Sequence, residues 1–565
     1  MLTEQIQSRY QTWLDSVQDE ALLAELKDMQ GDEARIEDAF YRDLTFGTGG
    51  LRGVLGAGTN RMNLYVVARA AQGLADYVIK RFPLEQRAIA ISYDSRINSE
   101  LFARVSAGVF AANGIRAHIY PRLMPTPLLS FATRALRCAA GVMVTASHNP
   151  SKYNGYKVYG ADGCQITTEA ADTILGEIEK LDTFRDVRRG DFEEGLRSGM
   201  IAWIGEDVYT AFVESVKAES MLTAGDKVDK DVAIVYTPLN GTGLGPVTRI
   251  LRESGFTNIA VVKEQEQPDG HFPTCPYPNP EIREAMQLGM EYAQRLGADL
   301  LLATDPDADR CGIAVRDARG GYQLLTGNET GMLLLDYICS RRQATGRMPA
   351  HPVMVKTIVT TDMGARIARK YGVETRDVLT GFKFIGEQIG LLEKEGRDKD
   401  YIFGFEESYG YLSGAYVRDK DAVNAAFLIC EMFAWYKTQG LGLLDVLDGL
   451  YAEYGRSLNT LHSYTFEGAS GFEKMKAIMQ SFRAPQEAFG GVRVLETLDY
   501  LPGRDGLPRS NVIKYLLEGN CSVVVRPSGT EPKMKVYISV SAADQAACEA
   551  LEKRIAGDVE KRFRA

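Results

Sequence analysis

The sequence predicts an α/β fold, and two observations support this. Short apolar runs such as residues 139–144 and 300–302 end in polar turn residues, which is typical of interior strands in a parallel sheet. Runs of this kind alternate with stretches of helical spacing, an order that predicts a mixed or mostly parallel sheet. The length of 565 residues is enough for roughly three to five domains. We therefore expect several α/β units in one chain.

The expected elements follow one another along the whole chain. They are helical spacing over 2–30, a strand at 88–93, a helix at 99–113, strands at 117–120, 139–144, 232–236, 259–262 and 300–302, a helix after 327–329, a strand at 353–356, a helix at 422–436, strands at 457–466, 523–525 and 534–540, and a charged final helix. Each strand is an apolar or β-branched run between turn residues, whereas the helices have apolar residues three or four apart.

Composition limits the class of protein. The net charge of −10 argues against a nucleic-acid-binding protein, which needs a basic surface, so any anion site must gather its Lys and Arg locally. No apolar stretch approaches the ~20 residues of a membrane span, and the first residues do not resemble a signal peptide. The eight scattered cysteines show no zinc spacing. We expect a cytoplasmic protein with reduced cysteines.

A polar loop follows the strand at 139–144, with the sequence Thr-Ala-Ser-His-Asn-Pro over residues 145–150. Open α/β sheets bind ligands at the carboxyl ends of their strands. Ser147 is there a hydroxyl nucleophile beside His148, with Lys157 ten positions on, and such groups can move protons and hold phosphate oxygens. The alternative is a polar loop without chemistry.

Three aspartates, Asp305, Asp307 and Asp309, alternate after the apolar run 300–302. Pro306 favours an extended Asp305, so the three carboxylates can converge on one point. Close like charges require a cation, and ligation by oxygen alone suits Mg²⁺. An EF-hand is excluded, because the chain has arginine where that motif needs Gly and Glu. A phosphatase with an aspartyl nucleophile and a solvated acidic loop are the alternatives.

Three further segments can bind phosphate or hydroxyl groups. Residues 46–53 are rich in glycine and contain an arginine, and residues 526–530 combine an arginine, two hydroxyls and a glycine, so both can hold a phosphate. Surface turns are the alternative for both. In the loop 403–410, Glu406 and Ser408 can bond vicinal sugar hydroxyls, or the carboxylate can pair with a nearby cation.

These segments, in this order, resemble the α-D-phosphohexomutase family of phosphoglucomutases and phosphomannomutases. The resemblance covers about residues 40–545 and is most specific at 145–150 and 305–310. It implies three similar α/β domains with mixed sheets and a smaller C-terminal α+β domain, similar to the TATA-box-binding protein, around a central cleft. The domains are expected at 1–205, 206–322, 323–454 and 455–565.

The resemblance also implies a role for each matched residue. Ser147 is expected to be the phosphoserine. The catalytic residues would be Ser147, His148, Lys157, Arg52 and Arg310. One Mg²⁺ per chain would be held by Asp305, Asp307, Asp309 and a phosphate oxygen on Ser147. The sugar would be bound by Thr380, Gly381, Glu406 and Ser408, and the non-transferring phosphate by Lys420, Arg526, Ser528, Gly529 and Thr530.

The reaction implied is the interconversion of glucose 1-phosphate and glucose 6-phosphate, with glucose 1,6-bisphosphate as intermediate and activator. The Glu-Glu-Ser form of residues 406–408 favours glucose, while residues 46–53 and 58–63 resemble a subgroup that includes phosphopentomutases. Phosphomannomutase and phosphopentomutase are therefore alternatives, and an aspartyl-phosphate sugar phosphatase or a non-catalytic sugar-phosphate binder are alternatives of a different class. We expect no nucleic-acid or membrane partner, and a monomer or weak homodimer.

Overall fold

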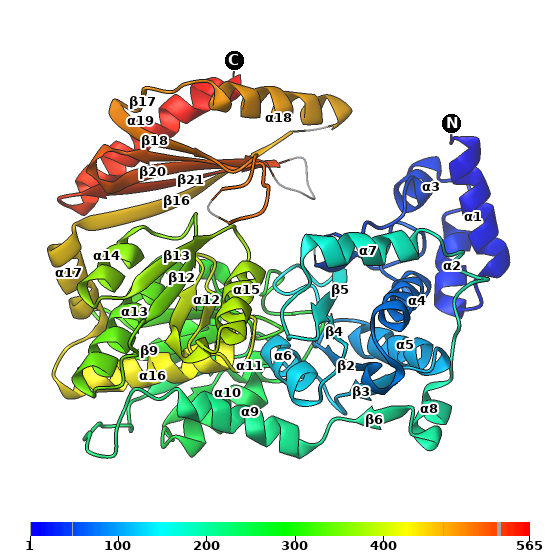
Figure 1. Cartoon of the computed structure of the whole chain (residues 1–565), viewed down its shortest axis with the longest axis horizontal. Helices are drawn as coiled ribbons and strands as arrows, with labels where there is room; N and C mark the ends of the chain where they lie inside the picture. The colour runs from blue at the N-terminus through cyan, green and yellow to red at the C-terminus, as the bar shows by residue number, and fades with distance from the viewer. Residues whose placement is uncertain (1, 48, 467, 505, 528–532, 565) are drawn as a thin grey trace.

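A computed structural model of the chain describes residues 2–47, 49–466, 468–504, 506–527 and 533–564. These residues form four units, each built on one β-sheet (Figure 1). The first three sheets are mixed and flanked by helices, and the fourth is antiparallel, so the predicted fold class is confirmed. The boundaries expected between the domains stay a prediction.

The first unit contains a six-stranded sheet in the order β1-β5-β4-β2-β3-β6. Its strands are β1 (Gly50–Val54), β2 (Ala88–Tyr93), β3 (Arg116–Ile119), β4 (Ala140–Val144), β5 (Tyr153–Gly160) and β6 (Ile201–Trp203). Its helices are α4 (Leu64–Arg81), α5 (Ser99–Ala112), α6 (Thr126–Ala135), α7 (Thr168–Ile178) and α8 (Phe192–Ser198). Helices α4, α5 and α7 pack in one core with the sheet, and α6 packs in another, so the sheet is covered on both faces.

The helical stretch expected over 2–30 is two helices, α1 (Glu4–Ser16) and α2 (Glu20–Asp28), and not one. The break arises because Asp19 caps α2, its side chain accepting a 2.9 Å hydrogen bond from the N–H of Leu22. With α3 (Glu33–Phe40), they form a cap at the edge of the first unit (Figure 1). The cap packs on α4 through the edge-on contact of Trp13 with Tyr65, and Trp13 makes a second edge-on contact with Phe40 inside the cap.

The second unit has a five-stranded sheet in the order β11-β10-β9-β7-β8. Its strands are β7 (Ile234–Thr237), β8 (Ile259–Val261), β9 (Leu300–Thr304), β10 (Cys311–Arg316) and β11 (Tyr322–Leu325). Its helices are α9 (Glu206–Ala218), α10 (Leu244–Glu253), α11 (Lys263–Glu266) and α12 (Arg283–Leu296). Strands β7, β8 and β9 are parallel, whereas the hairpin β9-β10 is antiparallel and carries the three aspartates at its turn.

The third unit has four strands in the order β13-β12-β14-β15. They are β12 (Val353–Thr357), β13 (Glu374–Val378), β14 (Tyr401–Phe405) and β15 (Tyr411–Leu412). The helices are α13 (Gly327–Ala344), α14 (Met363–Lys370), α15 (Phe382–Lys394), α16 (Ala422–Thr438) and α17 (Leu443–Tyr454). Helix α16 is buried over most of its length, because it also packs on α10 of the second unit. The second and third units therefore share one core.

The fourth unit has an antiparallel sheet in the order β16-β21-β20-β19-β18-β17. Its strands are β16 (Arg456–Thr465), β17 (Ala488–Phe489), β18 (Val492–Asp499), β19 (Ile513–Leu517), β20 (Cys521–Pro527) and β21 (Lys533–Ala542). Two helices, α18 (Gly468–Arg483) and α19 (Gln545–Arg564), cover one face, and the sheet stands above the third unit (Figure 1).

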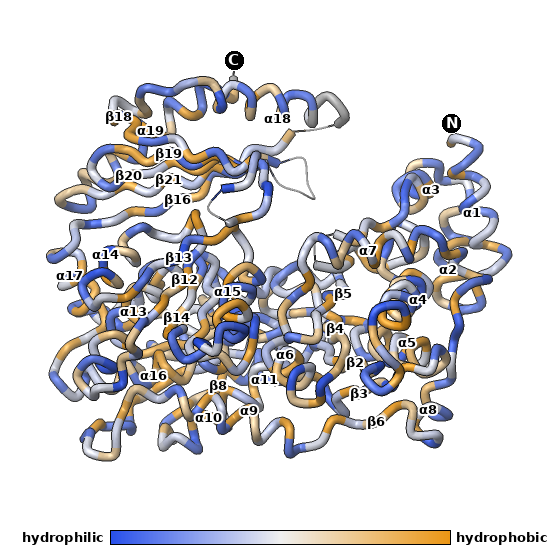
Figure 2. The backbone as a smooth tube through the Cα atoms, in the orientation of Figure 1, coloured by the Kyte–Doolittle hydropathy of each residue, from blue (hydrophilic) through white to orange (hydrophobic). Residues whose placement is uncertain are grey.

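Hydrophobic residues follow the strands of the sheets, and hydrophilic residues lie on outer helices and loops (Figure 2). Strands β4 and β9 are buried at every residue, as their apolar sequences predict. All eight cysteines are buried, and none forms a disulfide. No helix in the described part of the chain is both long and apolar enough to cross a bilayer.

Candidate active site

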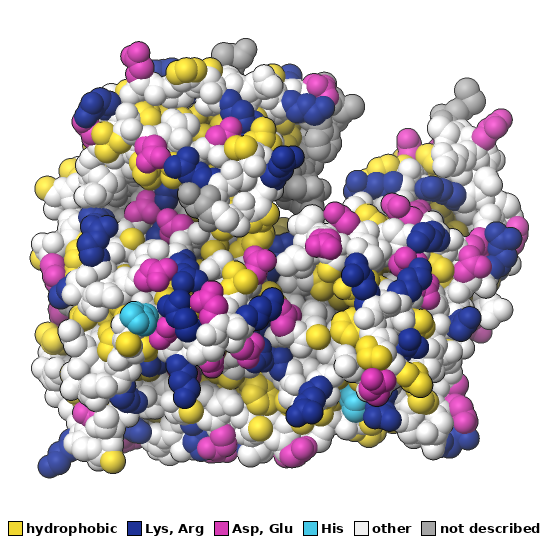
Figure 3. All heavy atoms as spheres, in the orientation of Figure 1, with side chains coloured by type: hydrophobic (Ala, Val, Ile, Leu, Met, Phe, Trp, Pro, Cys, Tyr) yellow, Lys and Arg dark blue, Asp and Glu magenta, His cyan; other side chains and the backbone are white. Residues whose placement is uncertain are grey.

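The four units surround one cleft, which has a volume of about 1480 Å³. Figure 3 shows the molecule hollowed between the C-terminal unit, at upper left, and the N-terminal unit, at right. The predicted site residues on the wall of this cleft are Arg52, Ser147, His148, Lys157, Asp309, Arg310, Thr380, Gly381, Glu406, Ser408, Lys420 and Arg526. Segments from all four units therefore meet there.

Ser147 lies just beyond the carboxyl end of β4. Its φ of 53° is in the left-handed region, which residues other than glycine rarely adopt. The residue is 3% exposed, and its Oγ donates a 2.9 Å hydrogen bond to Oδ2 of Asp305. Nδ1 of His148 lies 3.2 Å from the same Oγ. One hydroxyl thus has both an acid–base partner and a carboxylate within reach.

Two buried residues that the sequence analysis did not select hold this loop in shape. The guanidinium of Arg96 donates to four backbone carbonyls between residues 147 and 153. Asp94 pairs with that guanidinium at 3.3 Å and accepts a 2.6 Å bond from Oγ1 of Thr145, which in turn accepts the N–H of Ser147 at 2.8 Å. Asp94 and Arg96 directly follow β2, but only these long-range contacts identify their role.

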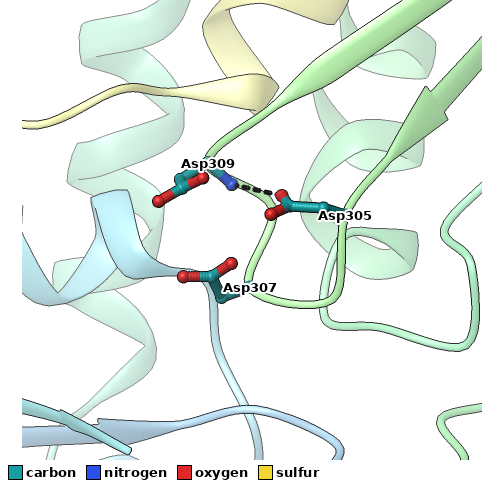
Figure 4. Close-up of side chains that lie close together, drawn as sticks. All are labelled: Asp305, Asp307 and Asp309. Carbon is teal, nitrogen blue, oxygen red and sulfur yellow. Dashed lines mark hydrogen bonds between the residues drawn. The ribbon is translucent and has the colours of Figure 1, made fainter. Parts of the chain in front are cut away.

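The three aspartates form one cluster of carboxylates. Figure 4 shows Asp305, Asp307 and Asp309 pointing toward one another, and one oxygen from each lies within 4.8 Å of the others. All three are buried, and Oδ1 of Asp307 and of Asp309 has no hydrogen-bond partner among the residues that the structure describes. Buried, unpartnered carboxylate oxygens are costly unless a cation neutralises them. The donor set therefore fits a hard divalent cation.

The surroundings distribute charge unevenly over this cluster. Burial, and then the two neighbouring aspartates, raise the pKa of Asp305 well above its usual value. Burial alone would also raise the pKa of Asp307, but Lys157 at 2.7 Å and the Thr126 hydroxyl at 2.8 Å lower it. The pKa of Asp309 is likewise lowered, because cations outweigh burial. Of the three carboxylates, Asp305 is thus the one whose ionised form the surroundings favour least.

Two lysine ammonium groups contact the cluster. Nζ of Lys157 on β5 lies 2.7 Å from Asp307 and 3.3 Å from Asp309, and Nζ of Lys420 lies 3.0 Å from Asp309. Burial alone would lower the pKa of each lysine, but the carboxylates raise both. Lys420, which was expected among the ligands of the distal phosphate, therefore lies beside the aspartates in this structure.

His148 and Arg52 lie on the side of the first unit. Burial, and then the nearby charges of Arg310 and Arg52, hold the pKa of His148 well below its usual value, so its imidazole is neutral near pH 7. Nη1 of Arg52, on β1, lies 3.5 Å from Oδ1 of Asn149. A neutral imidazole can accept a proton, and Arg52 brings positive charge to the loop of Ser147.

Arg310 links the aspartate cluster to the cleft. Its backbone N–H donates a 3.0 Å hydrogen bond to Oδ1 of Asp305, and its Nη1 pairs with Glu281. Its Nε lies 4.0 Å from Asp305 and 3.9 Å from Asp309. Burial alone would lower the pKa of Arg310, but Glu281 and the aspartates raise it. The sequence analysis did not select Glu281.

The loop expected to bind sugar is on the third unit. The N–H of Gly381, whose φ is 120°, donates a 3.0 Å hydrogen bond to Oε1 of Glu406. Burial, opposed by Lys420, raises the pKa of Glu406 to about 7. Oγ1 of Thr380 is buried and has no hydrogen-bond partner among the described residues, and Ser408 is half-buried. These groups line the same cleft and can bond hydroxyl groups.

Phe405, immediately before Glu406, does not line the cleft. It is fully buried, and its ring stacks on Phe403 with 5.6 Å between centroids. Gly331 and Gly364 leave the space for this ring, because a Cβ at these glycines would lie 2.2 Å and 3.1 Å from it. Phe405 therefore anchors the end of β14 in the core.

The distal end of the cleft belongs to the fourth unit. Arg526 lies near the end of β20, and Lys533 and Lys535 of β21 line the cleft with it. Residues 528–530, the other predicted phosphate ligands, lie outside the described residues, so their role stays a prediction. Positive side chains nevertheless gather at this end, as binding of a phosphate requires.

Comparisons with known proteins agree with this architecture. Residues 43–185, 209–320 and 326–454 match, respectively, alpha/beta/alpha domains I, II and III of "Phosphoglucomutase/phosphomannomutase". Two solved structures share the fold. The first is pp63/parafusin (phosphoglucomutase) from Paramecium, with a TM-score of 0.69 and 17% identity, and the match covers 93% of this chain and 95% of that one. The second is a phosphoglucomutase/phosphomannomutase family protein from Burkholderia thailandensis, with a TM-score of 0.67 and 19% identity, and the match covers 92% of this chain and 96% of that one.

Relatives of known name are more similar in sequence. The chain is 36% identical over 540 residues to a phosphoglucomutase of Staphylococcus saprophyticus, covering 94% of this chain and 96% of the relative. It is 37% identical over 544 residues to a phosphoglucomutase of Staphylococcus aureus, covering 94% and 95%. The chain therefore belongs to the phosphoglucomutase/phosphomannomutase family of isomerases.

Proposed function

We propose that the chain is a Mg²⁺-dependent phosphoglucomutase that interconverts glucose 1-phosphate and glucose 6-phosphate through phospho-Ser147 and glucose 1,6-bisphosphate. The observation that carries the proposal is the contact of 2.9 Å between Oγ of Ser147 and Asp305, which belong to different units. A phosphoryl group on this oxygen lies next to the carboxylate cluster. The names of the curated relatives support glucose phosphates as substrates.

Asp305, Asp307 and Asp309 would hold the metal ion, together with a phosphate oxygen on Ser147. The unpartnered oxygens of Asp307 and Asp309 support this assignment, and Mg²⁺ prefers carboxylate and phosphate oxygens. When bound, the ion would neutralise charge that develops on the transferring phosphoryl group. Lys157 and Lys420 supply further positive charge to the same place.

Phosphoryl transfer breaks the bond from phosphorus to Oγ of Ser147 and forms one to a sugar hydroxyl, whose proton must leave. Lys157 is the residue proposed to move that proton: its neutral amine would take the proton up, and its ammonium form, which Asp307 and Asp309 favour in the described geometry, would return one in the reverse transfer. The neutral His148 moves a proton at Oγ of Ser147, 3.2 Å from its Nδ1. Arg52 and Arg310 stabilise the charge on the phosphoryl group.

The remaining residues orient the substrate. The groups proposed to read the sugar are Thr380, Gly381, Glu406 and Ser408, and those proposed to hold the non-transferring phosphate are Lys420, Arg526, Ser528, Gly529 and Thr530. After the first transfer, the bisphosphate exchanges its two phosphates between the ends of the cleft, and the second one returns to Ser147. The volume of the cleft leaves room for this turn.

The sugar specificity is tested by comparing kcat/KM for glucose 1-phosphate, mannose 1-phosphate and ribose 1-phosphate. The proposal expects the highest value for glucose 1-phosphate. Phosphomannomutase and phosphopentomutase, on the same scaffold, predict the highest value for mannose and ribose, respectively.

Replacing Ser147 tests the mechanism directly. Ser147→Ala removes the oxygen that carries the phosphoryl group, so we expect kcat to fall by roughly 10⁴-fold or more. The measurement is interconversion of glucose 1-phosphate and glucose 6-phosphate with Mg²⁺ and glucose 1,6-bisphosphate present. A Ser147→Ala protein with full activity would contradict the proposal.

The phosphatase alternative differs in the residue that carries phosphate. Both oxygens of Asp305 already accept hydrogen bonds, from Ser147 and from the N–H groups of Asp309 and Arg310, which disfavours it as a nucleophile. Fragmentation mass spectrometry of the intact protein should find phosphate on Ser147 and none on Asp305. A non-catalytic binder predicts tight binding of phosphosugar without turnover.

A further inference from the structure

The ion pair between Glu281 and Arg310 has no part in the roles assigned so far. Both residues line the cleft, with side chains 29% and 16% exposed. An ion pair with this little solvent contact is screened less than a surface pair, and its geometry is held more firmly. Glu281 therefore has the means to fix the direction of the Arg310 guanidinium.

Glu281 is itself fixed by its loop. Its N–H donates a 3.1 Å hydrogen bond to Oδ1 of Asn279, whose carbonyl accepts the N–H of Ile282 at 3.1 Å. Pro280 packs on Gly312 of β10 so closely that a Cβ at that glycine would lie 2.7 Å from the proline carbonyl oxygen. The carboxylate is thus carried by backbone that packs directly on β10, the strand that Arg310 precedes.

The other end of the pair is equally constrained. The backbone N–H of Arg310 is bonded to Asp305, so its Cα is tied to the aspartate cluster. Of its guanidinium, only Nη1 has a hydrogen-bond partner among the described residues, and Nε is buried without one. Glu281 therefore uses one donor of the planar group and leaves the others for an anion.

Those remaining donors lie next to the predicted phosphoryl position. Nε is 4.0 Å from Oδ2 of Asp305, the atom that accepts the hydrogen bond from Oγ of Ser147. A planar guanidinium that is bound through Nη1 can rotate little, so its other N–H groups keep fixed directions. Such preorganised donors stabilise a transition state without a cost for reorientation.

We propose that Glu281 is a positioning residue for phosphoryl transfer, acting through Arg310, an inference that rests on the function proposed above. It holds the guanidinium at Nη1 so that the free N–H groups meet the phosphoryl group between Ser147 and the substrate. Without the carboxylate, the arginine keeps its charge but loses its fixed direction. The role differs from that of the aspartates, because Glu281 is no metal ligand and needs no contact with substrate.

The experiment is a double-mutant cycle on the full chain with glucose 1-phosphate, Mg²⁺ and glucose 1,6-bisphosphate. E281Q keeps the size of the side chain and removes its charge, and we expect kcat to fall roughly 10- to 100-fold with KM changed less than about threefold. E281D keeps the charge on a shorter arm and should recover part of the loss. In the R310Q background, E281Q should have less than about a twofold further effect, because the residue through which it acts is gone.

The control is Glu253→Gln, which removes the charge of a carboxylate paired at 2.8 Å with Arg249 on the surface of the same unit, and which should leave kcat unchanged. Wild-type kcat for E281Q would overturn the proposal, and so would an equal loss from E281Q with and without Arg310. If E281Q does not fold, E281D alone and in the R310Q background makes the same test. If only the role of Glu281 is wrong, the wild-type protein still interconverts glucose phosphates. If the proposed function is wrong, the wild-type protein does not.

Discussion

The third unit contacts the first unit and the fourth unit through interfaces that differ in their interactions. Toward the first unit, Glu393 accepts hydrogen bonds of 2.7 Å from both Arg134 and Arg418, and Arg418 has a fully buried side chain. There, Ser130 of the first unit also accepts the backbone N–H of Arg418 at 3.0 Å, and Tyr159 donates to Asp419 at 2.8 Å. Side chains are thus bonded directly to the backbone segment that carries Lys420.

Toward the fourth unit, the polar contacts centre on Asp362, with a second ion pair between Arg456 and Asp448 at 3.3 Å. Asp362 accepts bonds from Lys514 at 2.9 Å and Ser522 at 3.2 Å, beside the fully buried Lys356 at 3.1 Å. The apolar part of this interface is small: it consists of Ile358, Val359 and Leu379 against Tyr500, Val512, Val524 and Tyr537. Because the described contacts centre on one aspartate and one small apolar cluster, we expect this interface to rearrange more easily than the first one.

The two interfaces lie near opposite ends of the cleft, so their difference in construction separates these two ends. Ser147 and the aspartates meet where contacts are dense, and transfer of a phosphoryl group requires such fixed geometry. Arg526 lies on the fourth unit, where an adjustable phosphate site would suit the proposed intermediate, which must turn over between two orientations. We expect substitutions at the first end to lower kcat and substitutions at the second to raise KM.

Among the substitutions that test this comparison, the largest effect is expected at Arg96, which holds the loop of Ser147. Arg96→Met removes hydrogen bonds to four carbonyls and lets the loop leave its left-handed conformation, so kcat should fall about 100-fold with little change in KM. Steady-state kinetics and phosphorylation of Ser147 by glucose 1,6-bisphosphate provide the measurement.

Arg104→Met, at an exposed arginine of the same unit, is the matched control and should leave kcat and KM unchanged. Arg96→Lys retains the charge and tests the loop if the methionine variant does not fold. Normal phosphorylation of Ser147 in a folded Arg96 variant would show that the loop does not need this clamp.

A smaller effect is expected at the interface of the third and fourth units. Asp362→Asn removes the charge that joins Lys514 to Lys356, so the orientation in which Arg526 faces the cleft is less populated. KM should rise roughly tenfold, since apparent affinity falls with the population of the competent state, while kcat stays within a factor of about three.

Glu393→Gln is the matched substitution at the other interface. It should lower the Tm by about 2–4 °C and leave KM unchanged, because dense contacts remain around it. Equal changes of KM in the two variants would remove the distinction between the interfaces.

The smallest effect concerns pH and the sugar loop. Glu406 has a pKa raised to about 7 by burial, so between pH 8 and pH 6 it gains a proton and loses part of its capacity to accept hydrogen bonds from sugar hydroxyls. KM for glucose 1-phosphate should therefore rise about threefold as the pH falls through 7.

Glu406→Gln separates this change from titration of the substrate phosphate, whose second pKa is about 6. The variant should have a higher KM at pH 8 and a smaller change of KM on acidification. An identical pH profile in the variant and the wild type would assign the dependence to the substrate.

The sequence predicted the parts of the site that depend on local patterns. Strands β4 and β9 are apolar runs that end in turns, so Ser147 and Asp305 could be placed at the carboxyl ends of strands from neighbouring residues alone. Strand β5 was not predicted, because its glycines and Lys157 interrupt the expected pattern. Local pattern thus finds the hydroxyl and the carboxylates that we propose as nucleophile and metal ligands.

Residues that act through distant contacts could not be predicted in this way. The guanidinium of Arg96 bonds carbonyls more than fifty positions away, and Glu281 meets Arg310 only because Pro280 packs on β10. No pattern in the sequence indicated the contact between Lys420 and Asp309, because that contact joins two units; a role of Lys420 at the distal phosphate stays a prediction. The domain order can be read from the sequence, but the packing between domains cannot.

The ring of Phe405, seated against Gly331 and Gly364, has a consequence for protein engineering. A larger residue at Gly331 or Gly364 would displace the ring and, with it, the adjoining Glu406. These two glycines and Phe405 should therefore be left unchanged in any library of variants aimed at new sugars. Diversity belongs at Thr380 and Ser408, where side chains reach the cavity without supporting the strand.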